Sequence, residues 1–334
     1  MSICRQVVGA QLIARDEQNV AHRHLRFPGP AQSARIPASV VGITAGPREH
    51  EVDARWLMAY AAALGEEAPE YFDTARAGGV LAHPLFPVCY EWPLALDVRA
   101  MALPDEIAVR GVHATHRLTV HRPIRAGERL RTTATVATLS PRSPGAYMVL
   151  RLETVDTSGR PVTTTDYGSL YLGIPCDASP LSPQGRGQGE GWPSGEEPPK
   201  DATPSDTWST EVPISPTLAH VYSECARIWN PIHTDRAVAR AAGLPDIILH
   251  GTATLALAIS ETLRHDPRGP AAPVRALGCR FGAMVPLPSR LVVRGRRPEP
   301  SSGGSTVRFE ALVEDGRPAV RDGAIVLADG GSPS

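Results

Sequence analysis

Residues 222–257 read YSECARIWNPIHTDRAVARAAGLPDIILHGTATLAL and contain two short polar motifs in an otherwise largely apolar stretch. The first motif is NPIHTD, from Asn230 to Asp235, and the second is His250-Gly251-Thr252, seventeen residues after His233. A proline restricts the turn before the first histidine. Thr234 or Asp235 is suited to cap a short helix over 236–242, which a glycine would end. An apolar helix is predicted over 252–263. The stretch therefore predicts a rigid turn and a buried helix, each beginning beside a histidine.

The length and composition predict a two-domain globular protein. A chain of 334 residues suits two domains of about 130–150 residues and a linker better than one domain. Hydrophobic residues make up 42% and charged residues 21%, as in soluble proteins. With 34 Lys and Arg against 35 Asp and Glu, the net charge of −1 gives no sign of a nucleic-acid partner. No apolar run approaches the roughly 20 residues of a membrane span.

The spacing of the cysteines and the composition of the N-terminal residues indicate where in the cell the protein is located. The five cysteines are widely spaced and form no C-x-x-C pair, which favours a reducing cytoplasm over a disulfide framework or a zinc site. The opening residues, MSICRQVVGAQLIARDEQ, lack a sustained apolar core with a cleavage site, so no secretory signal is predicted. We therefore expect a cytoplasmic protein.

Composition divides the chain at one clear linker. Residues 176–209 are dense in Pro, Gly, Ser and charge. They have little apolar surface to bury, so burial cannot offset the conformational entropy that they would lose on ordering. Residues 1–47 are interpreted as an arm of uncertain structure, and 329–334 as a tail. Two units remain, at 48–175 and 210–328.

Both units show a helical pattern followed by strand patterns. In the first, 52–64 has helical spacing, 82–88 is predicted to be an extended wall segment because prolines bracket it, and a helix is predicted over 94–102. Strands are predicted at 112–120, 129–139, 146–155 and 162–172, and in the second unit at 274–281, 289–296, 306–313 and 319–327. Helix first and antiparallel strands afterwards is the order expected when a sheet curls around a central helix. This predicts an α+β fold, with that unit present twice.

The stretch from Tyr222 to Leu257 resembles the hydratase motif of the MaoC-like dehydratases, the (R)-specific enoyl-CoA hydratase (hydratase 2) group. The resemblance is specific in the motif and architectural elsewhere. It implies a double hot-dog fold over about 48–328, with a first half that mainly shapes an acyl tunnel. It also implies an acyl-CoA or acyl-carrier-protein thioester substrate and a homodimer. No metal or redox cofactor is implied.

Hydration of an enoyl thioester needs a base for the water proton and a donor for the enolate-like oxygen on the thioester carbonyl. His233 suits the first task because its ordinary pKa of about 6.5 is easily tuned for neutral pH. Asn230 can hold the loop or orient a ligand. Gly251 suits the second task, because a helix N-terminus presents unpaired N–H groups and the positive end of the helix dipole. The predicted substrate-binding residues are Ile228, Trp229, His250, Thr252, Phe86 and Tyr90.

One position departs from the family's pattern. The usual motif has a Gly-Asp pair just before the Asn, and its Asp forms the catalytic dyad with the His; here these positions carry Arg227 and Ile228. Three interpretations stay open. The histidine acts alone or with a carboxylate from elsewhere, such as Glu224 or Glu91. The site isomerises or cyclises an acyl thioester instead. Or the protein binds such thioesters without turning them over.

Overall fold

The structure, a computed structural model, describes residues 34–177, 207–301 and 304–329. The first half contains β1 (Thr44–Val52), α1 (Ala54–Ala63), α2 (Pro69–Phe72), α3 (Pro87–Ala102), α4 (Asp105–Ala108), β2 (Gly111–Val120), β3 (Glu128–Arg142), β4 (Gly145–Asp156) and β5 (Pro161–Leu172). The second half contains β6 (Thr207–Ile214), α5 (Leu218–Ala226), α6 (Arg236–Ala241), α7 (Gly251–Arg264), β7 (Val274–Phe281), β8 (Ser289–Arg296), β9 (Glu299–Ser301), β10 (Gly304–Leu312) and β11 (Pro318–Ala328). Short 3₁₀ turns lie at Ala38–Val40, Pro231–His233 (η4) and Gly269–Ala271.

The strands form one antiparallel sheet in the order β1-β3-β4-β5-β2-β7-β11-β10-β8-β6, with β9 paired to β10. Apart from β9, the two halves have the same internal order: the first strand lies at the outer edge, and the third, fourth, fifth and second follow it inward. The halves meet where β2 pairs with β7, from Thr115 opposite Arg280 to Thr119 opposite Ala276. The chain thus repeats one topology, although the halves show no close sequence repeat.

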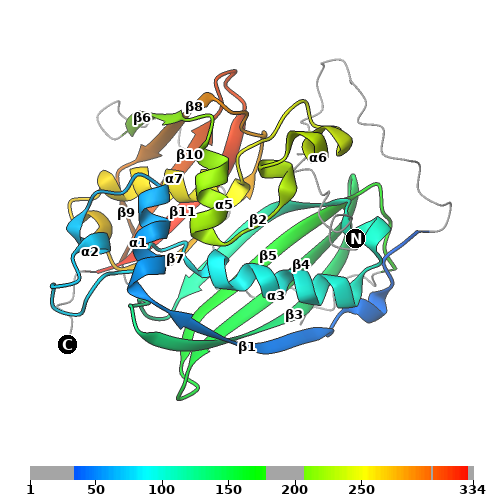
Figure 1. The fold of residues 1–334 in the computed structure, drawn as a ribbon, viewed down its shortest axis with the longest axis horizontal. Helices are drawn as coiled ribbons and strands as arrows, with labels where there is room; N and C mark the ends of the chain where they lie inside the picture. The colour runs from blue at the N-terminus through cyan, green and yellow to red at the C-terminus, as the bar shows by residue number, and fades with distance from the viewer. Residues whose placement is uncertain (1–33, 178–206, 302–303, 330–334) are drawn as a thin grey trace.

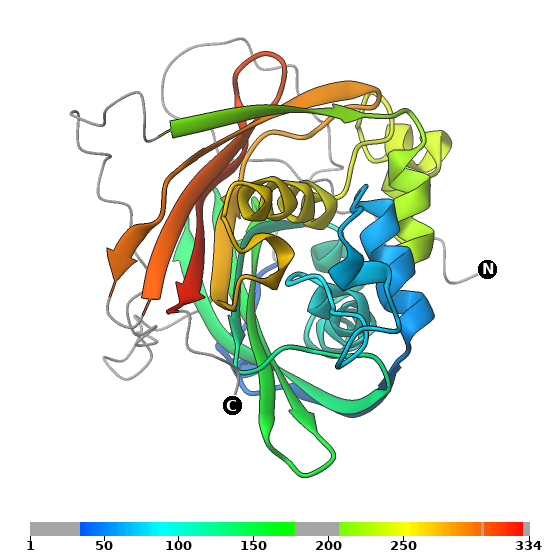
Figure 2. The same cartoon turned by 90° about the vertical axis from the view of Figure 1, so that its left-hand side faces the viewer.

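Each half packs a central helix against the concave side of its sheet. Figure 1 shows α3 lying along β3, β4 and β5, and in Figure 2 α3 is seen nearly end-on with the strands curving around it and α7. Helix α7 is buried along almost its whole length, and α3 packs Leu94, Ala95 and Val98 into a core shared with β3 and β4. This arrangement confirms the predicted α+β double hot-dog fold.

The predicted strands agree with the structure except at the two outer edges and at the three-residue strand β9, where a turn was predicted. The first strand of each half, β1 and β6, has no counterpart among the predicted strands. Both strands are largely exposed and both contain a proline, Pro47 or Pro213. An edge strand that has no partner on one side tolerates proline and polar residues, so it lacks the alternating apolar pattern. That is why the pattern indicated a helix as the first element of each half.

The central helix of the first half also differs from the prediction. It begins at Pro87 rather than near Leu94, so Tyr90 and Trp92 lie on a helix and not in an extended segment. Pro87 occupies the first helical turn, where its missing N–H costs nothing. Pro93 lies inside the helix. Two prolines in seven residues favoured an extended segment, but tertiary packing of the helix outweighed that local preference.

The predicted limits of the two units lie close to those strands. β1 begins at Thr44 and β6 at Thr207, a few residues before the predicted starts at 48 and 210. Most of the predicted arm (1–47), linker (176–209) and tail (329–334) lies outside the described residues. The division into units at 48–175 and 210–328 stays a prediction.

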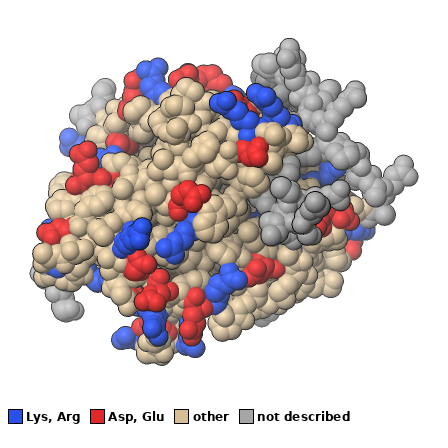
Figure 3. Space-filling model, in the orientation of Figure 1, with Lys and Arg blue, Asp and Glu red and all other residues tan. Residues whose placement is uncertain are grey.

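The outer surface carries mixed charge. On the face shown in Figure 3, acidic and basic side chains alternate over both halves without an extended patch of one sign. Within the described ranges, no helix has the length and apolar character needed to cross a bilayer.

We expect Gly168→Ala to destabilise the fold by about 1–3 kcal/mol, because overpacking a tight site forces side chains apart. An added methyl group on β5 would overlap both the Thr115 hydroxyl and the Tyr147 hydroxyl, which share a hydrogen bond of 2.6 Å. Chemical denaturation of the variant beside Thr119→Ala, an exposed control on the paired strand β2, measures the effect. Equal unfolding free energies for the two variants would contradict it.

Candidate active site

A cavity lies between the two halves, with about 840 Å³ of space between its walls, part of which is open solvent. The first half contributes Val88, Glu91, Trp92, Ala95, Arg99, Ala108, Gly111, His113, His116, Leu152 and Tyr167. The second half contributes Ile228, Asn230, Ile232, His233, His250, Gly251 and Thr252. Six of the nine predicted site residues therefore line one cavity.

His233 is held rigidly on the second-half wall. Asn230 precedes η4 and its side-chain oxygen accepts a hydrogen bond from the Ile232 amide at 3.2 Å, which stabilises the turn. The buried imidazole of His233 has its Nδ1 2.8 Å from the carbonyl oxygen of Ile248. Because a carbonyl can only accept, Nδ1 carries the proton and Nε2 keeps its lone pair. Burial lowers the pKa of His233 to about 4, against the opposite effect of the Ile248 carbonyl. At neutral pH the ring is a neutral base.

His250 lies directly on His233. Their rings stack with centroids 3.7 Å apart, and His250 Nε2 is 3.1 Å from the Ser223 hydroxyl. Burial lowers the pKa of His250 well below its ordinary value, and the neighbouring His233 lowers it further. Protonating both of two stacked imidazoles in an apolar setting costs much free energy, because burial disfavours each charge and the two charges repel. A proton on His233 therefore disfavours a second one on His250, and His250 stays neutral.

The N-terminus of α7 is the second element of this wall. His250 is the residue before the helix, and Gly251 is its first residue and lines the cavity. The first amides of a helix have no intrahelical acceptor and lie at its positive end. Glycine leaves this backbone open to close approach by a ligand. Thr252 lines the cavity too, and its hydroxyl interacts with the Tyr222 phenol. This corner can stabilise an oxyanion.

Ile228 lines the cavity without offering any polar group. It is 4% exposed and follows Arg227, which ends α5 in the left-handed conformation with φ 57° and ψ 35°. Glycine is usual at such a helix end because it has no Cβ to strain. The Arg227 guanidinium lies over the Trp56 ring, with its carbon 3.9 Å from the centroid. Arginine thus adopts a backbone conformation that usually favours glycine, while the side chain after it is apolar.

Of the two carboxylates named as substitutes, Glu91 lines the cavity and Glu224 does not. Glu91 projects from α3 and is 3% exposed, whereas Glu224 is exposed on α5. The Thr165 hydroxyl donates a hydrogen bond to Glu91 Oε1 at 2.7 Å. Burial raises the pKa of Glu91 to about 8, an effect that this hydrogen bond only partly opposes. At neutral pH the group is mainly a protonated carboxylic acid.

Three predicted substrate-binding residues lie away from the cavity lining. Trp229 is 58% exposed, although its neighbours Ile228 and Asn230 both line the cavity. Phe86 is fully buried against Trp56, with ring centroids 5.0 Å apart. Tyr90 is buried on α3, with its hydroxyl 3.1 Å from the Thr163 hydroxyl. The interpretation of 82–88 as a wall segment implied that these two rings contact the substrate. In the structure they pack in the hydrophobic core instead.

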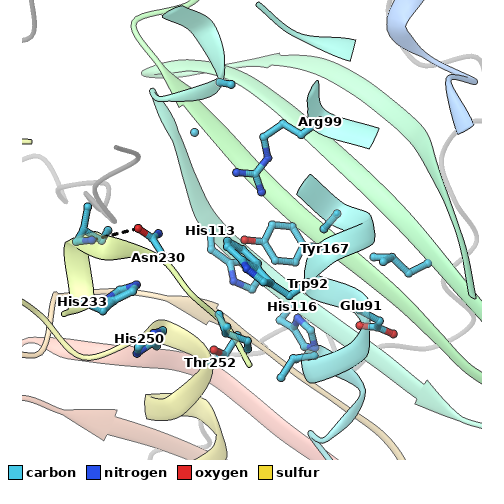
Figure 4. Close-up of a pocket in the computed structure, with 18 residues that line it drawn as sticks. Glu91, Trp92, Arg99, His113, His116, Tyr167, Asn230, His233, His250 and Thr252 are labelled. Carbon is cyan, nitrogen blue, oxygen red and sulfur yellow. Dashed lines mark hydrogen bonds between the residues drawn. The ribbon is translucent and has the colours of Figure 1, made fainter. Parts of the chain in front are cut away.

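Apart from Glu91, the sequence did not indicate the polar side chains that the first half contributes. His113 and His116 lie on β2, Tyr167 on β5 and Arg99 on α3, and all four line the cavity (Figure 4). Strict alternation would put the two histidines on opposite faces of β2. The pairing of β2 with β5 shifts register between His113 and Thr115, and such a bulge re-aims side chains. Their ring centroids are therefore only 5.5 Å apart.

The four cavity histidines do not form a metal site. Within the part of the chain that the structure describes, no group of three or more His, Cys, Asp or Glu side chains is arranged to hold a metal ion. Burial lowers the pKa of His116 to about 4 and that of His113 well below its ordinary value. The cavity thus combines neutral imidazoles, one carboxylic acid and one guanidinium.

Comparisons with known proteins agree with this fold and cavity. Residues 201–316 match the model of the MaoC like domain, and residues 39–165 match the FAS1-like, dehydratase domain region. A UPF0336 protein of Streptomyces coelicolor is 28% identical over 136 residues, which cover 39% of this chain and 90% of that protein. A UPF0336 protein of Saccharopolyspora erythraea is 30% identical over 124 residues, covering 34% of this chain and 77% of that protein.

Solved structures share the architecture over most of the chain. A MaoC-like dehydratase from Phytophthora capsici gives a TM-score of 0.74 at 21% identity, over 89% of this chain and 99% of that one. The peroxisomal multifunctional enzyme type 2 of Drosophila melanogaster gives 0.63 at 22% identity, over 86% of this chain and 48% of that one. A Mycobacterium tuberculosis protein described as a double hotdog fold gives 0.57 at 16% identity, over 86% and 96%.

Fold and cavity together define a double hot-dog protein whose site lies between its halves. The chain belongs with the UPF0336 proteins, and it contains a MaoC like domain over residues 201–316 and a FAS1-like dehydratase region over residues 39–165.

Proposed function

We propose that the protein is a hydro-lyase that reversibly hydrates a trans-2-enoyl thioester to the β-hydroxyacyl thioester. The observation that carries this proposal is the fixed tautomer of His233. Its Nδ1 is bonded to the Ile248 carbonyl, so Nε2 is a neutral base in the cavity that Gly251 also lines. Enoyl hydration requires this pair of functions, a base and an oxyanion donor, side by side.

In the hydration direction, His233 Nε2 takes a proton from water while the water oxygen bonds to the β-carbon. The electron pair of the carbon–carbon double bond moves through the α-carbon onto the thioester oxygen. The amide of Gly251 and the positive end of α7 stabilise that oxyanion. The oxyanion then collapses as the α-carbon takes up a proton, and the product leaves as the β-hydroxyacyl thioester.

We assign the donor of that second proton to Glu91. It lines the same cavity and is mainly protonated at neutral pH, because burial raises its pKa to about 8. Figure 4 draws it on the α3 side of the cavity, across from His233. After the addition, the proton on His233 returns to the Glu91 carboxylate through water, which restores both groups. A carboxyl group from the first half would thus replace the one missing at Ile228.

A second candidate function is favoured by Ile228 itself. A family member that lost its motif carboxylate can retain the cavity and bind acyl thioesters without hydrating them, or isomerise or cyclise them. Removal of one member of a catalytic pair costs several orders of magnitude in rate. The buried Glu91 supports the lyase over these alternatives.

Three further features complete the proposal. The thioester is carried by coenzyme A or an acyl carrier protein, since the enoyl and β-hydroxyacyl groups need a thioester activating group. The described cysteines Cys89, Cys176, Cys225 and Cys279 are free thiols, which supports a cytoplasmic location. The protein is proposed to form homodimers.

Incubation with crotonyl-CoA and longer enoyl-CoA thioesters tests the lyase directly. We expect the absorbance of the conjugated enoyl thioester to fall to an equilibrium value, and the reverse rise to follow from the β-hydroxyacyl thioester. Binding shown by calorimetry without any change in absorbance, for every chain length, would instead support a binding subunit. A new product without net water uptake, detected by mass spectrometry, would support isomerisation or cyclisation.

A further inference from the structure

The first-half wall of the cavity carries a cation for which the proposed reaction has no use. Val88, Trp92, Ala95 and Arg99 follow one another at helical spacing along the cavity-facing side of α3. In Figure 4 the Arg99 guanidinium points into the cavity, toward the side where Tyr167, His113 and Asn230 lie. A helix side chain leans toward the N-terminus, and the Arg99 guanidinium carbon is 6.0 Å from the centroid of the Trp92 ring.

Neutral groups surround this guanidinium. It interacts with the Tyr167 hydroxyl, and Tyr167 stacks on His113 with ring centroids 3.7 Å apart and an interplanar angle of 14°. Arg99 is half-buried, and its Nε is fully buried without a hydrogen-bond partner among the described residues. None of the ion pairs among the described residues involves Arg99; the nearby acidic residue Asp97 pairs with Arg48 on the outside of α3.

Two buried histidines on the same wall of the cavity also have unused ring nitrogens. His113 is 6% exposed and His116 1% exposed, and His113 Nε2 and both nitrogens of His116 have no hydrogen-bond partner among the described residues. Buried polar atoms are nearly always paired, and a charge without a counter-ion in such a setting is costly. A wall made of a guanidinium, a phenol and imidazoles matches an anion, and it does not match the methyl end of a fatty acyl chain.

We propose that Arg99, with Tyr167 and His113 beside it, binds a carboxylate at the far end of the acyl chain. The substrate class is then a thioester of an unsaturated dicarboxylic acid. This inference rests on the proposed hydro-lyase function. Arginine presents N–H groups in a planar fork that fits a carboxylate with two parallel hydrogen bonds. A site built around such a pair rejects analogues that lack the anion, because the guanidinium is then left desolvated and unpaired.

The test compares trans-2-enoyl thioesters of N-acetylcysteamine, which carry no phosphate, with four, six and eight acyl carbons. Each length is made with a carboxylate, a carboxamide or a methyl group at the far end. At the best-fitting length we expect kcat/KM for the carboxylate to exceed that for the carboxamide by about 10- to 100-fold, the range of a charge-assisted pair. Equal values at every length would overturn the inference.

Arg99→Gln should abolish that preference, and Arg99→Lys should keep part of it, because lysine retains the charge without the fork. Arg48→Gln is the matched control, since Arg48 pairs with Asp97 on the exposed side of the same helix, 3.0 Å away. Arg48→Gln should leave the preference unchanged. Thermal unfolding shows whether each variant is folded, and Arg99→Lys carries the test if Arg99→Gln is not.

Two further arms distinguish an acyl carboxylate from a coenzyme phosphate and separate binding from turnover. Calorimetric titration with saturated dicarboxylic and monocarboxylic thioesters measures the preference without turnover, so it tests the inference even if the enzyme hydrates nothing. Arg99→Gln could weaken the binding of coenzyme A thioesters equally for every acyl chain and leave the binding of N-acetylcysteamine thioesters unchanged. In that case Arg99 binds a phosphate of the coenzyme, and the acyl-carboxylate inference is wrong.

Discussion

His233→Asn is expected to lower kcat/KM for enoyl-thioester hydration by about 100- to 10,000-fold, the usual contribution of a positioned general base. Asparagine is the informative replacement, because its amide nitrogen falls near the position of histidine Nδ1. It can therefore still donate to the Ile248 carbonyl, which lies 2.8 Å from Nδ1 in the structure. What the variant loses is Nε2 and its lone pair. The turn from Asn230 to His233 should keep its shape.

Steady-state kinetics and thioester binding are measured on the same His233→Asn protein. We expect kcat to fall while the dissociation constant for a saturated acyl thioester changes little. His220→Asn is the control, because His220 is exposed on α5 and its Nε2 contacts only the Thr234 carbonyl, at 3.1 Å. A variant at His233 that turned over within a few-fold of the natural rate would remove this residue from the mechanism.

Glu91→Gln is expected to lower kcat by about 100-fold or more, since a proton donor contributes on the scale of general acid catalysis. Glutamine has the same shape and keeps an oxygen that can accept the Thr165 hydroxyl, now bonded to Glu91 at 2.7 Å. It cannot supply a proton. Glu224→Gln makes the same side-chain replacement on the exposed side of α5 and should leave the rate unchanged. Equal activity of the two variants would count against Glu91.

The pH dependence of activity tests the roles of His233 and Glu91 independently of the substitutions. The base works when His233 is neutral, and its pKa is lowered to about 4, so activity should fall as the pH drops through that value. The acid works when Glu91 is protonated, and its pKa is raised to about 8, so activity should fall as the pH rises through that value. The expected log(kcat/KM) profile is a bell with limbs near these two values. Glu91→Gln should lose the alkaline limb, and a limb that persists would belong to another group.

Residues close together in the chain could be predicted as parts of one site. Asn230, His233, His250 and Gly251 act over short sequence distances, and a turn and a helix start are local structures with recognisable signals. The interior strands were predicted for the same reason, since burial on one face imposes alternation. The edge strands β1 and β6 were missed because exposure removes that constraint.

Glu91 apart, the first-half wall of the cavity could not be predicted, and its physical causes are non-local. His113 and His116 share a face only because β2 shifts register against β5, and register depends on the partner strand. Glu91 lies on α3 because this helix begins at Pro87, a start that packing made possible against the local effect of its prolines. None of these residues lies near the motif in sequence.

The sequence by itself predicted the family resemblance and the double hot-dog fold, and it brought His233 and Gly251 together as a candidate base and oxyanion corner, because local patterning and one compact motif encode them. Only the tertiary structure decided what faces that corner. The pairing of β2 with β7 brings the first half against the motif, and with it the buried Glu91 and the Arg99 guanidinium, which forms no ion pair among the described residues. By resemblance the motif would carry a carboxylate at Ile228, and Glu91 on the opposite wall is the proposed replacement, because a cavity is closed by residues that are neighbours in space and not in the chain.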